Sequence, residues 1–286
     1  MALDIKQTQK PVRKLRKVLM EASKEPTPVQ VHELRTHIRR LEALTSALAL
    51  DSQKSGQRLV KQLARIRKRS GKVRDMDVLT TDATQLNKGL DESCRVQLIQ
   101  HLGAQRRKEA KKLHKVIANL RPKVRQELKQ IGRRLENMIP DTRNDSGEAT
   151  AKATAAALEL EIELNVPSRF TRQNIHPYRL KVKELRNVLR LAQNSKDEDF
   201  IAALGEVKDA IGDWHDWEEL RAIADEVLDH SSGCQLKIEL KRICDEKYRS
   251  AVARAEDLRK KYLQTSGKGR KDPTKAAVVT MKTIAA

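Results

Sequence analysis

Apolar residues recur at spacings of three and four positions through most of the sequence, whereas the apolar–polar alternation of a β-strand hardly occurs. Because an α-helix turns about 100° per residue, this spacing collects apolar side chains on one side of a helix. The sequence therefore predicts an all-α protein. The predicted helices cover residues 8–24, 28–51, 56–70, 75–88, 92–119, 121–139, 148–162, 174–194, 197–211, 216–230 and 233–264.

The clearest break in this pattern is Pro140 and the turn-forming residues Asp-Thr-Arg-Asn-Asp-Ser-Gly that follow it. The end of the chain carries glycines, a proline and basic residues without helical periodicity, which is typical of a flexible tail. The predicted organisation is a first helical half at 1–140, a linker at 141–147, a second helical half at 148–264 and a flexible basic tail at 265–286.

An internal repeat relates the two halves. The segment VHELRTHIRRLEAL, which begins at Val31, aligns with IHPYRLKVKELRNV, which begins at Ile175. Further along, LARIRKRSGKVRDMDVL aligns with LGEVKDAIGDWHDWEEL and places Gly71 over Gly212. The two pairs of segments are offset by 144 and 141 residues. One short deletion in a loop would account for this difference. We therefore expect a duplicated helical unit.

The first repeated segment carries a basic stripe in both copies. His32, Arg35 and Arg39 fall within about 60° of one another around a helix, opposite its apolar residues. In the second copy the stripe consists of His176, Arg179, Lys183, Arg186 and Arg190. For one copy alone, a solvated helix face explains such a stripe, but a solvated face normally mixes both signs of charge. Its recurrence favours a face that binds an anion.

The overall charge and the side-chain chemistry favour a phosphate-rich polyanion. The formal net charge is +20, and residues 1–140 hold 33 basic and 14 acidic residues. Guanidinium groups form bidentate hydrogen bonds to phosphate oxygens, and phosphate stabilises protonated histidine. Additional basic residues one turn apart on the next helix would extend this surface, although ordinary solvated side chains explain them equally well; they are Lys61, Arg65 and Lys68.

The paired HxxRxxxRRL and RDxDVL patterns resemble the CHAD family, the conserved histidine α-helical domains. The clearest matches are Val31–Leu41 and Gly71–Leu79, and they recur at His176–Leu185 and Gly212–Leu220. The resemblance implies two pseudo-symmetric four-helix bundles around a central basic cavity. It further implies binding of inorganic polyphosphate and association with polyphosphate granules.

Carried over by position, the repeated stripes would contact polyphosphate. The predicted binding residues are His32, Arg35, Arg39, Arg40, Lys61, Arg65, Lys68, His176, Arg179, Lys183, Arg186 and Arg190. The second copy departs from the first where His215-Asp216 replaces Arg-Asp. This difference leaves open whether the two halves bind equally.

The sequence shows no pattern of an enzyme or of a cofactor site. It lacks a Ser/His/Asp triad, a P-loop and a dinucleotide-binding glycine pattern. The acidic alternation at 159–164 lacks the lysine of a triphosphate tunnel enzyme, and we interpret Asp75 and Asp216 as helix caps. The cysteines Cys94, Cys234 and Cys244 fall outside metal-ligand spacings. We therefore expect a noncatalytic protein without cofactor or bound metal.

Nonspecific nucleic-acid binding and a basic scaffold role stay open as alternatives, because a chain this basic attracts many polyanions. Only seven aromatic residues are available for base stacking, and no helix-turn-helix or zinc-finger pattern occurs. No stretch approaches the roughly 20 apolar residues of a membrane span. We expect a cytoplasmic protein at polyphosphate granules. Chain-length preference, oligomeric state and the contribution of the tail do not follow from the sequence.

Overall fold

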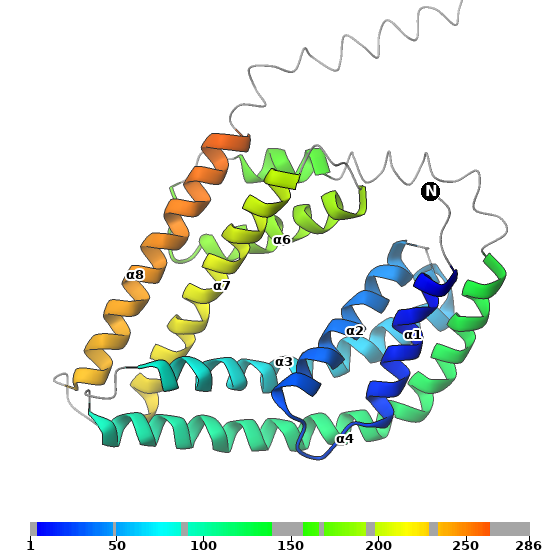
Figure 1. The fold of residues 1–286 in the computed structure, drawn as a ribbon, viewed down its shortest axis with the longest axis horizontal. Coiled ribbons are helices and arrows are strands. Elements are labelled where there is room, and N and C mark those ends of the chain that lie inside the picture. The colour runs from blue at the N-terminus through cyan, green and yellow to red at the C-terminus, as the bar shows by residue number, and fades with distance from the viewer. Residues whose placement is uncertain are drawn as a thin grey trace, which may run out of the picture. The chain divides into compact units, whose positions relative to one another are not determined.

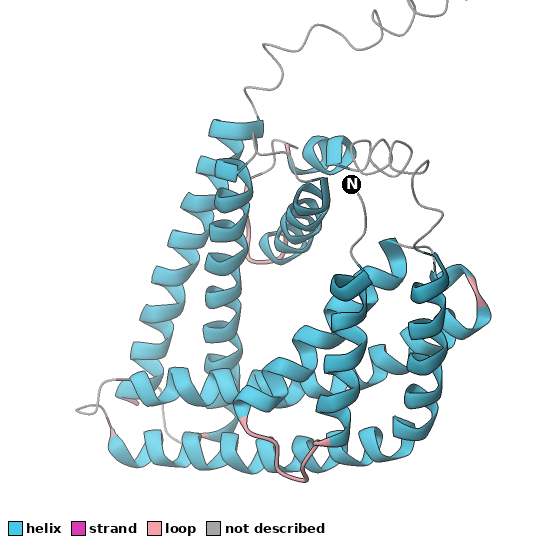
Figure 2. Cartoon of the chain, turned by 45° about the vertical axis from the view of Figure 1, so that its right-hand side comes forward, coloured by secondary structure: helices cyan, strands magenta, loops and turns pink. Residues whose placement is uncertain are grey.

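A computed structural model of the chain describes residues 5–47, 50–86, 91–138, 157–165, 169–192, 198–228 and 234–263. Within these ranges the regular secondary structure is entirely helical (Figure 2), which confirms the predicted fold class. The predicted linker at 141–147 and tail at 265–286 lie outside the described residues. No helix in the described part of the chain combines the length and apolar character needed to cross a membrane.

The long helices are shown in chain order in Figure 1. They are α1 (Ile5–Met20), α2 (Pro28–Ala47), α3 (Lys54–Gln85), α4 (Glu92–Met138), α6 (Ile175–Ala192), α7 (Glu198–Val227) and α8 (Gln235–Leu258). Shorter elements are a 3-10 turn at Leu50–Ser52, a helix at 157–164 and a π turn at Arg259–Leu263.

The chain forms two compact units. Unit 1 comprises Met1–Ser146 and Glu219–Leu240, and unit 2 comprises Gly147–Glu218 and Lys241–Ala286. In unit 1, α1 packs on α2 and α4, α2 packs on α3, and α3 runs along α4. The buried residues of unit 1 are almost all aliphatic, as the scarcity of aromatic residues predicts, and include Leu15, Leu34, Ile38, Leu41, Leu59, Leu63, Ile66, Leu113 and Leu128.

Unit 2 has a core of its own, which contains most of the aromatic residues of the chain. Its buried residues include Phe170, Ile175, Tyr178, Val182, Leu185, Leu204, Ile211, Trp214 and Leu258. Phe170 meets Tyr178 edge to face, with ring centroids 4.8 Å apart. Such pairs stabilise a core beyond their buried area.

The predicted breaks inside α3, α4 and α7 were wrong. Helix breaks were predicted at Gly71, near Pro122 and at Gly212, but each of the three helices continues through these positions. Gly71 and Gly212 do not end helices because each supports a close contact with an arginine, described below. At Pro122 the helix continues with Val124 buried in the core of unit 1, so packing outweighs the lost hydrogen bond.

The continuity of α3 and α7 also corrects the role of two aspartates. Asp75 and Asp216 were predicted to cap helix N-termini, yet both lie in helix interiors, far from any N-terminal turn. The acidic segment at 159–164 is helical and is therefore not a strand of a triphosphate tunnel enzyme, as expected from its missing lysine.

Gly56, in the first turn of α3, is a test of the packing between α3 and the preceding 3-10 turn. A Cβ at this position would lie 1.9 Å from the carbonyl oxygen of Leu50, which is backbone and cannot move aside as a side chain does. We expect Gly56→Ala to lower the free energy of unfolding by about 2 kcal/mol, within the range of overpacked cores. Urea denaturation followed by circular dichroism measures this change.

Gly103→Ala is the matched control. Its nearest neighbour outside the backbone is Arg107 Nη1, 3.9 Å from the added Cβ, so the substitution should be neutral or stabilising by about 0.5 to 1 kcal/mol. If the two variants are equally stable, Gly56 does not pack closely against the backbone of Leu50.

Candidate functional site

The two sides of α2 are chemically different. Val31 and Ile38 are fully buried in the core of unit 1. On the other side, His32 and Arg39 are exposed and Arg35 is half-buried. Burial of the apolar side therefore fixes which way the predicted basic stripe faces.

Arg35 reaches from α2 across to α3. Its Nη1 donates a 3.1 Å hydrogen bond to the backbone carbonyl of Arg67. A Cβ on Gly71 would lie only 2.8 Å from the same nitrogen, so this approach depends on the missing side chain. The carbonyl partly compensates the guanidinium for lost hydration. Arg35 is thus held in one orientation against α3.

Several other arginines act on Arg35. Burial lowers the pKa of Arg35 below its ordinary value, and the charge of Arg39 lowers it further. Asp75 opposes this effect, whereas Arg74 and Arg67 add to it. We call Arg35, Arg39, Arg67 and Arg74 the unit 1 arginine cluster. Its like charges raise the energy of the unliganded protein.

Two carboxylates offset part of this charge. Glu42 accepts from Arg67 Nε at 2.9 Å, and Asp75 acts on Arg35 as described. Around these residues, the first half of the chain holds 33 basic and 14 acidic residues at positions 1–140. An anion that approached the cluster would therefore be attracted.

The same contact recurs in unit 2 at the aligned positions. Arg179 Nε donates a 3.0 Å hydrogen bond to the carbonyl of Lys208 on α7. A Cβ on Gly212 would lie 2.7 Å from Arg179 Nη2. In each unit, the accepting carbonyl precedes the glycine by four residues, which is one helical turn. The two contacts are thus alike in donor, acceptor and glycine.

Arg186 makes a further contact of this kind two turns along α6. Its Nε donates to the carbonyl of Ile201 at 3.3 Å, and a Cβ on Gly205 would lie 3.1 Å from it. The aligned residue of α2 is Glu42, so unit 1 has no such arginine.

His176 lies beside a second histidine in unit 2. Its ring centroid is 4.7 Å from that of His215 on α7. Burial lowers the pKa of His176, and the charges of His215 and Arg179 lower it further. Its Nδ1 is buried without a hydrogen-bond partner among the described residues. The imidazole is therefore neutral in the unliganded protein at neutral pH.

The remaining predicted residues are less closely connected to these contacts. Arg40 is exposed on α2, and Lys183 is half-buried on α6. On α3, the exposed side chains of Lys61, Arg65 and Lys68 lie roughly 80° to 140° around the helix from the side that meets Arg35. The side chain of Arg190 lies outside the described residues.

Three residues of these contacts were not predicted as binding residues: Arg67, Arg74 and His215. The sequence did contain a signal for them. Both aligned segments have a glycine with a basic residue four positions before it and another three positions after it. This spacing places all three on the helix side that meets the arginine of the preceding helix.

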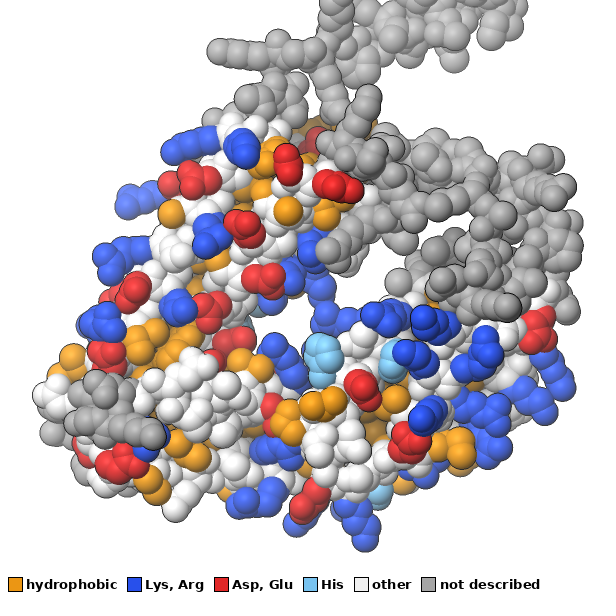
Figure 3. Space-filling model, viewed as in Figure 1, with side chains coloured by type: hydrophobic (Ala, Val, Ile, Leu, Met, Phe, Trp, Pro, Cys, Tyr) orange, Lys and Arg blue, Asp and Glu red, His pale blue; other side chains and the backbone are white. Residues whose placement is uncertain are grey.

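Charge is distributed differently over the two units on the face shown in Figure 3. Lysine and arginine gather over α1 and α2 of unit 1, whereas α7 and α8 of unit 2 show both signs. Ion pairs account for this mixture in unit 2, for example Lys247 with Asp213 at 2.7 Å and Arg254 with Glu206 at 2.9 Å. Residues 1–140, which form most of unit 1, hold 33 basic and 14 acidic residues, so the unbalanced positive charge is concentrated in unit 1.

The fold and the site together define an all-helical protein with paired arginine–glycine contacts and an excess of positive charge. Comparison with known proteins identifies the family of this chain. Residues 6–225 match the family model of the CHAD domain, so the chain belongs to the CHAD family. No curated protein matched the sequence.

A solved structure supports the fold. The chain is similar to the crystal structure of the CHAD domain from the plant Ricinus communis, with a TM-score of 0.62 and 14% sequence identity. The similarity covers 90% of this chain and 91% of the plant chain. At this identity, it shows a common fold.

The lowered pKa of His176 predicts a pH-dependent stability. Below the ordinary value of 6.5, the unfolded chain binds a proton at this site more readily than the folded chain. The free energy of unfolding should therefore fall as pH drops through 6.5 and level off below the folded pKa. Denaturant titrations of the wild type and of His176→Gln, between about pH 7.5 and 5, measure the contribution of this group.

We expect the stability difference between His176→Gln and the wild type to shift in favour of the variant as pH falls. His32→Gln, which changes the exposed histidine of α2, serves as the matched control. A difference that is constant across this pH range would show that His176 has the same proton affinity folded and unfolded.

Proposed function

We propose that this protein binds inorganic polyphosphate through the basic faces of α2 and α6, as a receptor rather than an enzyme. The observation that carries the proposal is the unit 1 arginine cluster, in which Arg35 is desolvated and surrounded by other guanidinium groups. Membership of the CHAD family supports the choice of ligand, because polyphosphate binding is what this resemblance implies.

The orientation of Arg35 and Arg179 favours phosphate binding. The hydrogen bond from Arg35 to a carbonyl uses one of the five N–H groups of a guanidinium and holds its plane. A guanidinium that is already oriented loses less conformational entropy when it binds phosphate. Flexible lysines provide charge without this advantage, so the oriented arginines should dominate affinity.

A linear polyanion can contact many cationic groups in succession. Once one basic face has bound, phosphates further along the same chain remain at high effective concentration for the other basic groups. The finer expectations, which are pseudo-symmetric duplication, a central basic cavity and association with polyphosphate granules, remain part of this proposal. The recurrence of the arginine–glycine contact in both units favours the duplication.

The decisive experiment compares two variants that lose the same charge. The test variant replaces Arg35, Arg39, Arg179 and Lys183 by Ala, and the control replaces the exposed Lys129, Arg133, Lys241 and Lys260 by Ala. Calorimetric titration with long-chain polyphosphate should show at least about a 100-fold loss of affinity in the test variant, since charged hydrogen bonds contribute about 1.5–3 kcal/mol each. The control should bind within a few-fold of the wild type.

Salt dependence distinguishes contacts from diffuse attraction. The slope of log K against log salt should become shallower by about 0.7 for each phosphate contact that the test variant loses. A short RNA at matched salt should bind more weakly than polyphosphate and should discriminate less between the variants. Equal losses of polyphosphate affinity in the test and control variants would overturn the proposal and leave a diffusely basic protein.

Polyphosphate binding should also take up a proton at His176. A phosphate next to the imidazole would raise its pKa from the lowered value of the unliganded protein, so affinity should increase as pH falls below about 6.5. Titrations in buffers of different ionisation enthalpy measure the proton uptake. His176→Gln should flatten the pH profile, and a flat profile in the wild type would remove His176 from the contacts.

A further inference from the structure

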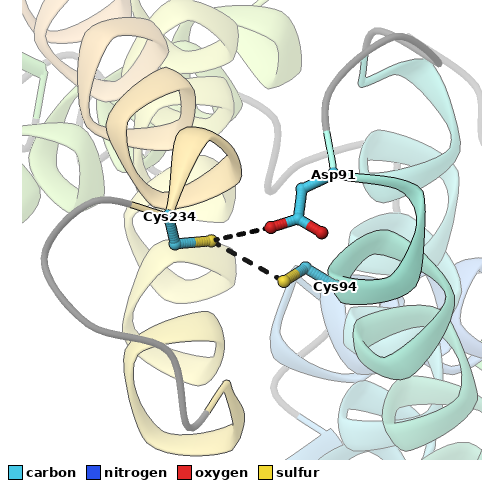
Figure 4. Close-up of side chains that lie close together, drawn as sticks. All are labelled: Asp91, Cys94 and Cys234. Carbon is cyan, nitrogen blue, oxygen red and sulfur yellow. Dashed lines mark hydrogen bonds between the residues drawn. The ribbon is translucent and has the colours of Figure 1, made fainter.

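Three potential metal ligands converge in unit 1 (Figure 4). Asp91 immediately precedes α4, Cys94 lies in the first turn of α4, and Cys234 immediately precedes α8. The two sulfur atoms are 3.7 Å apart, and Cys234 Sγ is 3.8 Å from Asp91 Oδ2. Segments 140 residues apart in the sequence thus place two thiols and a carboxylate together.

The distance between the sulfurs discriminates between two kinds of link. A disulfide bond is about 2.05 Å long, so the sulfurs would have to approach by about 1.6 Å. Two thiolates bound tetrahedrally to one zinc ion, each at about 2.3 Å, lie about 3.8 Å apart. The observed separation agrees with a shared metal ion and not with a disulfide.

We propose that Cys94, Cys234 and Asp91 form a binding site for a thiophilic divalent cation of the zinc type. The two sulfurs and one carboxylate oxygen provide three ligands, and all three donor atoms lie within 4.8 Å of one another. Asp91 is exposed, so water can complete a tetrahedral site. This proposal does not depend on polyphosphate binding.

The carboxylate of Asp91 places negative charge beside the two thiols, where a cation would be attracted. Cys94 is fully buried, and burial together with hydrogen bonding to Asp91 and Cys234 raises the pKa of its thiol to about 12. A divalent ion that binds the two sulfurs would displace the thiol protons to solvent. The N-termini of α4 and α8, each equivalent to about half a positive charge, offset the remaining negative charge.

Such a site would cross-link unit 1 rather than perform chemistry. Cys94 belongs to α4 and Cys234 to the start of α8, so the ion would hold together two chain segments far apart in sequence. The spacing of the cysteines gave no indication of this site because its ligands come from two separate segments. Bound metal should therefore raise the thermal stability of the chain.

The proposal is tested by adding Co²⁺ and then Zn²⁺ to the reduced, metal-free full-length chain. We expect one Co²⁺ per chain, with intense visible bands of tetrahedral geometry and sulfur-to-metal charge transfer, and displacement of Co²⁺ by Zn²⁺. Cys94→Ser and Cys234→Ser should abolish these bands and weaken Zn²⁺ binding at least about 100-fold. Even the loss of a group that orients a ligand costs roughly 10- to 100-fold.

Cys244→Ser is the matched control. Cys244 is also buried, but its thiol lies 3.2 Å from the carbonyl of Trp217 in unit 2, so this variant should keep the bands and the affinity. Asp91→Asn should keep the charge-transfer bands and bind Zn²⁺ more weakly. If Cys94→Ser does not fold, Cys234→Ser and native mass spectrometry of the wild type provide the same test.

Several results would overturn the proposal. One is the absence of stoichiometric metal in the wild type by native mass spectrometry after equimolar Zn²⁺ is added. Another is equal metal affinity in the wild type and the Cys234→Ser variant. A third is ready oxidation by air to a Cys94–Cys234 disulfide in a chain that binds no metal when reduced, which would identify the pair as a redox link instead.

Discussion

The hydrogen bond from a basic helix face to the carbonyl of the next helix is the interaction on which the candidate site depends. Arg35 and Arg179 each make it, and each does so above a glycine. This bond compensates a half-buried guanidinium for part of its lost hydration. Without the glycine, the side chain would be displaced by a Cβ. Together these two requirements explain why both aligned segments pair an arginine with a glycine.

Periodicity alone predicted most of the fold, because burial of one helix side dominates the energetics of such a chain. It placed the apolar side of α2 correctly, and Val31, Leu34 and Ile38 are all buried. It failed at Gly71, Gly212 and Pro122, where local propensity indicates a break. At these positions, packing and long-range contacts outweigh a local cost of a few kcal/mol at most.

The candidate site was less predictable than the fold. Helical spacing predicts which residues share one helix face, so the grouping of His32, Arg35 and Arg39 followed from the sequence. It does not predict which of them meets another helix, and only Arg35 of these three is half-buried. The approach of Cys234 to Cys94 is even less accessible to sequence reasoning, since it joins two segments that share no local pattern.

The two units show different balances between charge and aromatic packing. Where unit 1 has Arg74, unit 2 has His215, which lies against the ring of His176. The charge of His215 contributes to the lowered pKa of His176, and ion pairs on α7 and α8 balance part of the charge of unit 2. Residues 1–140, all in unit 1, hold 33 basic and 14 acidic residues, so unit 1 should attract an anion more strongly at neutral pH. Because the pKa of His176 is lowered, the attraction of unit 2 for an anion should increase on acidification. If both units bind the same polyanion, unit 1 should set the affinity at neutral pH and unit 2 its dependence on pH.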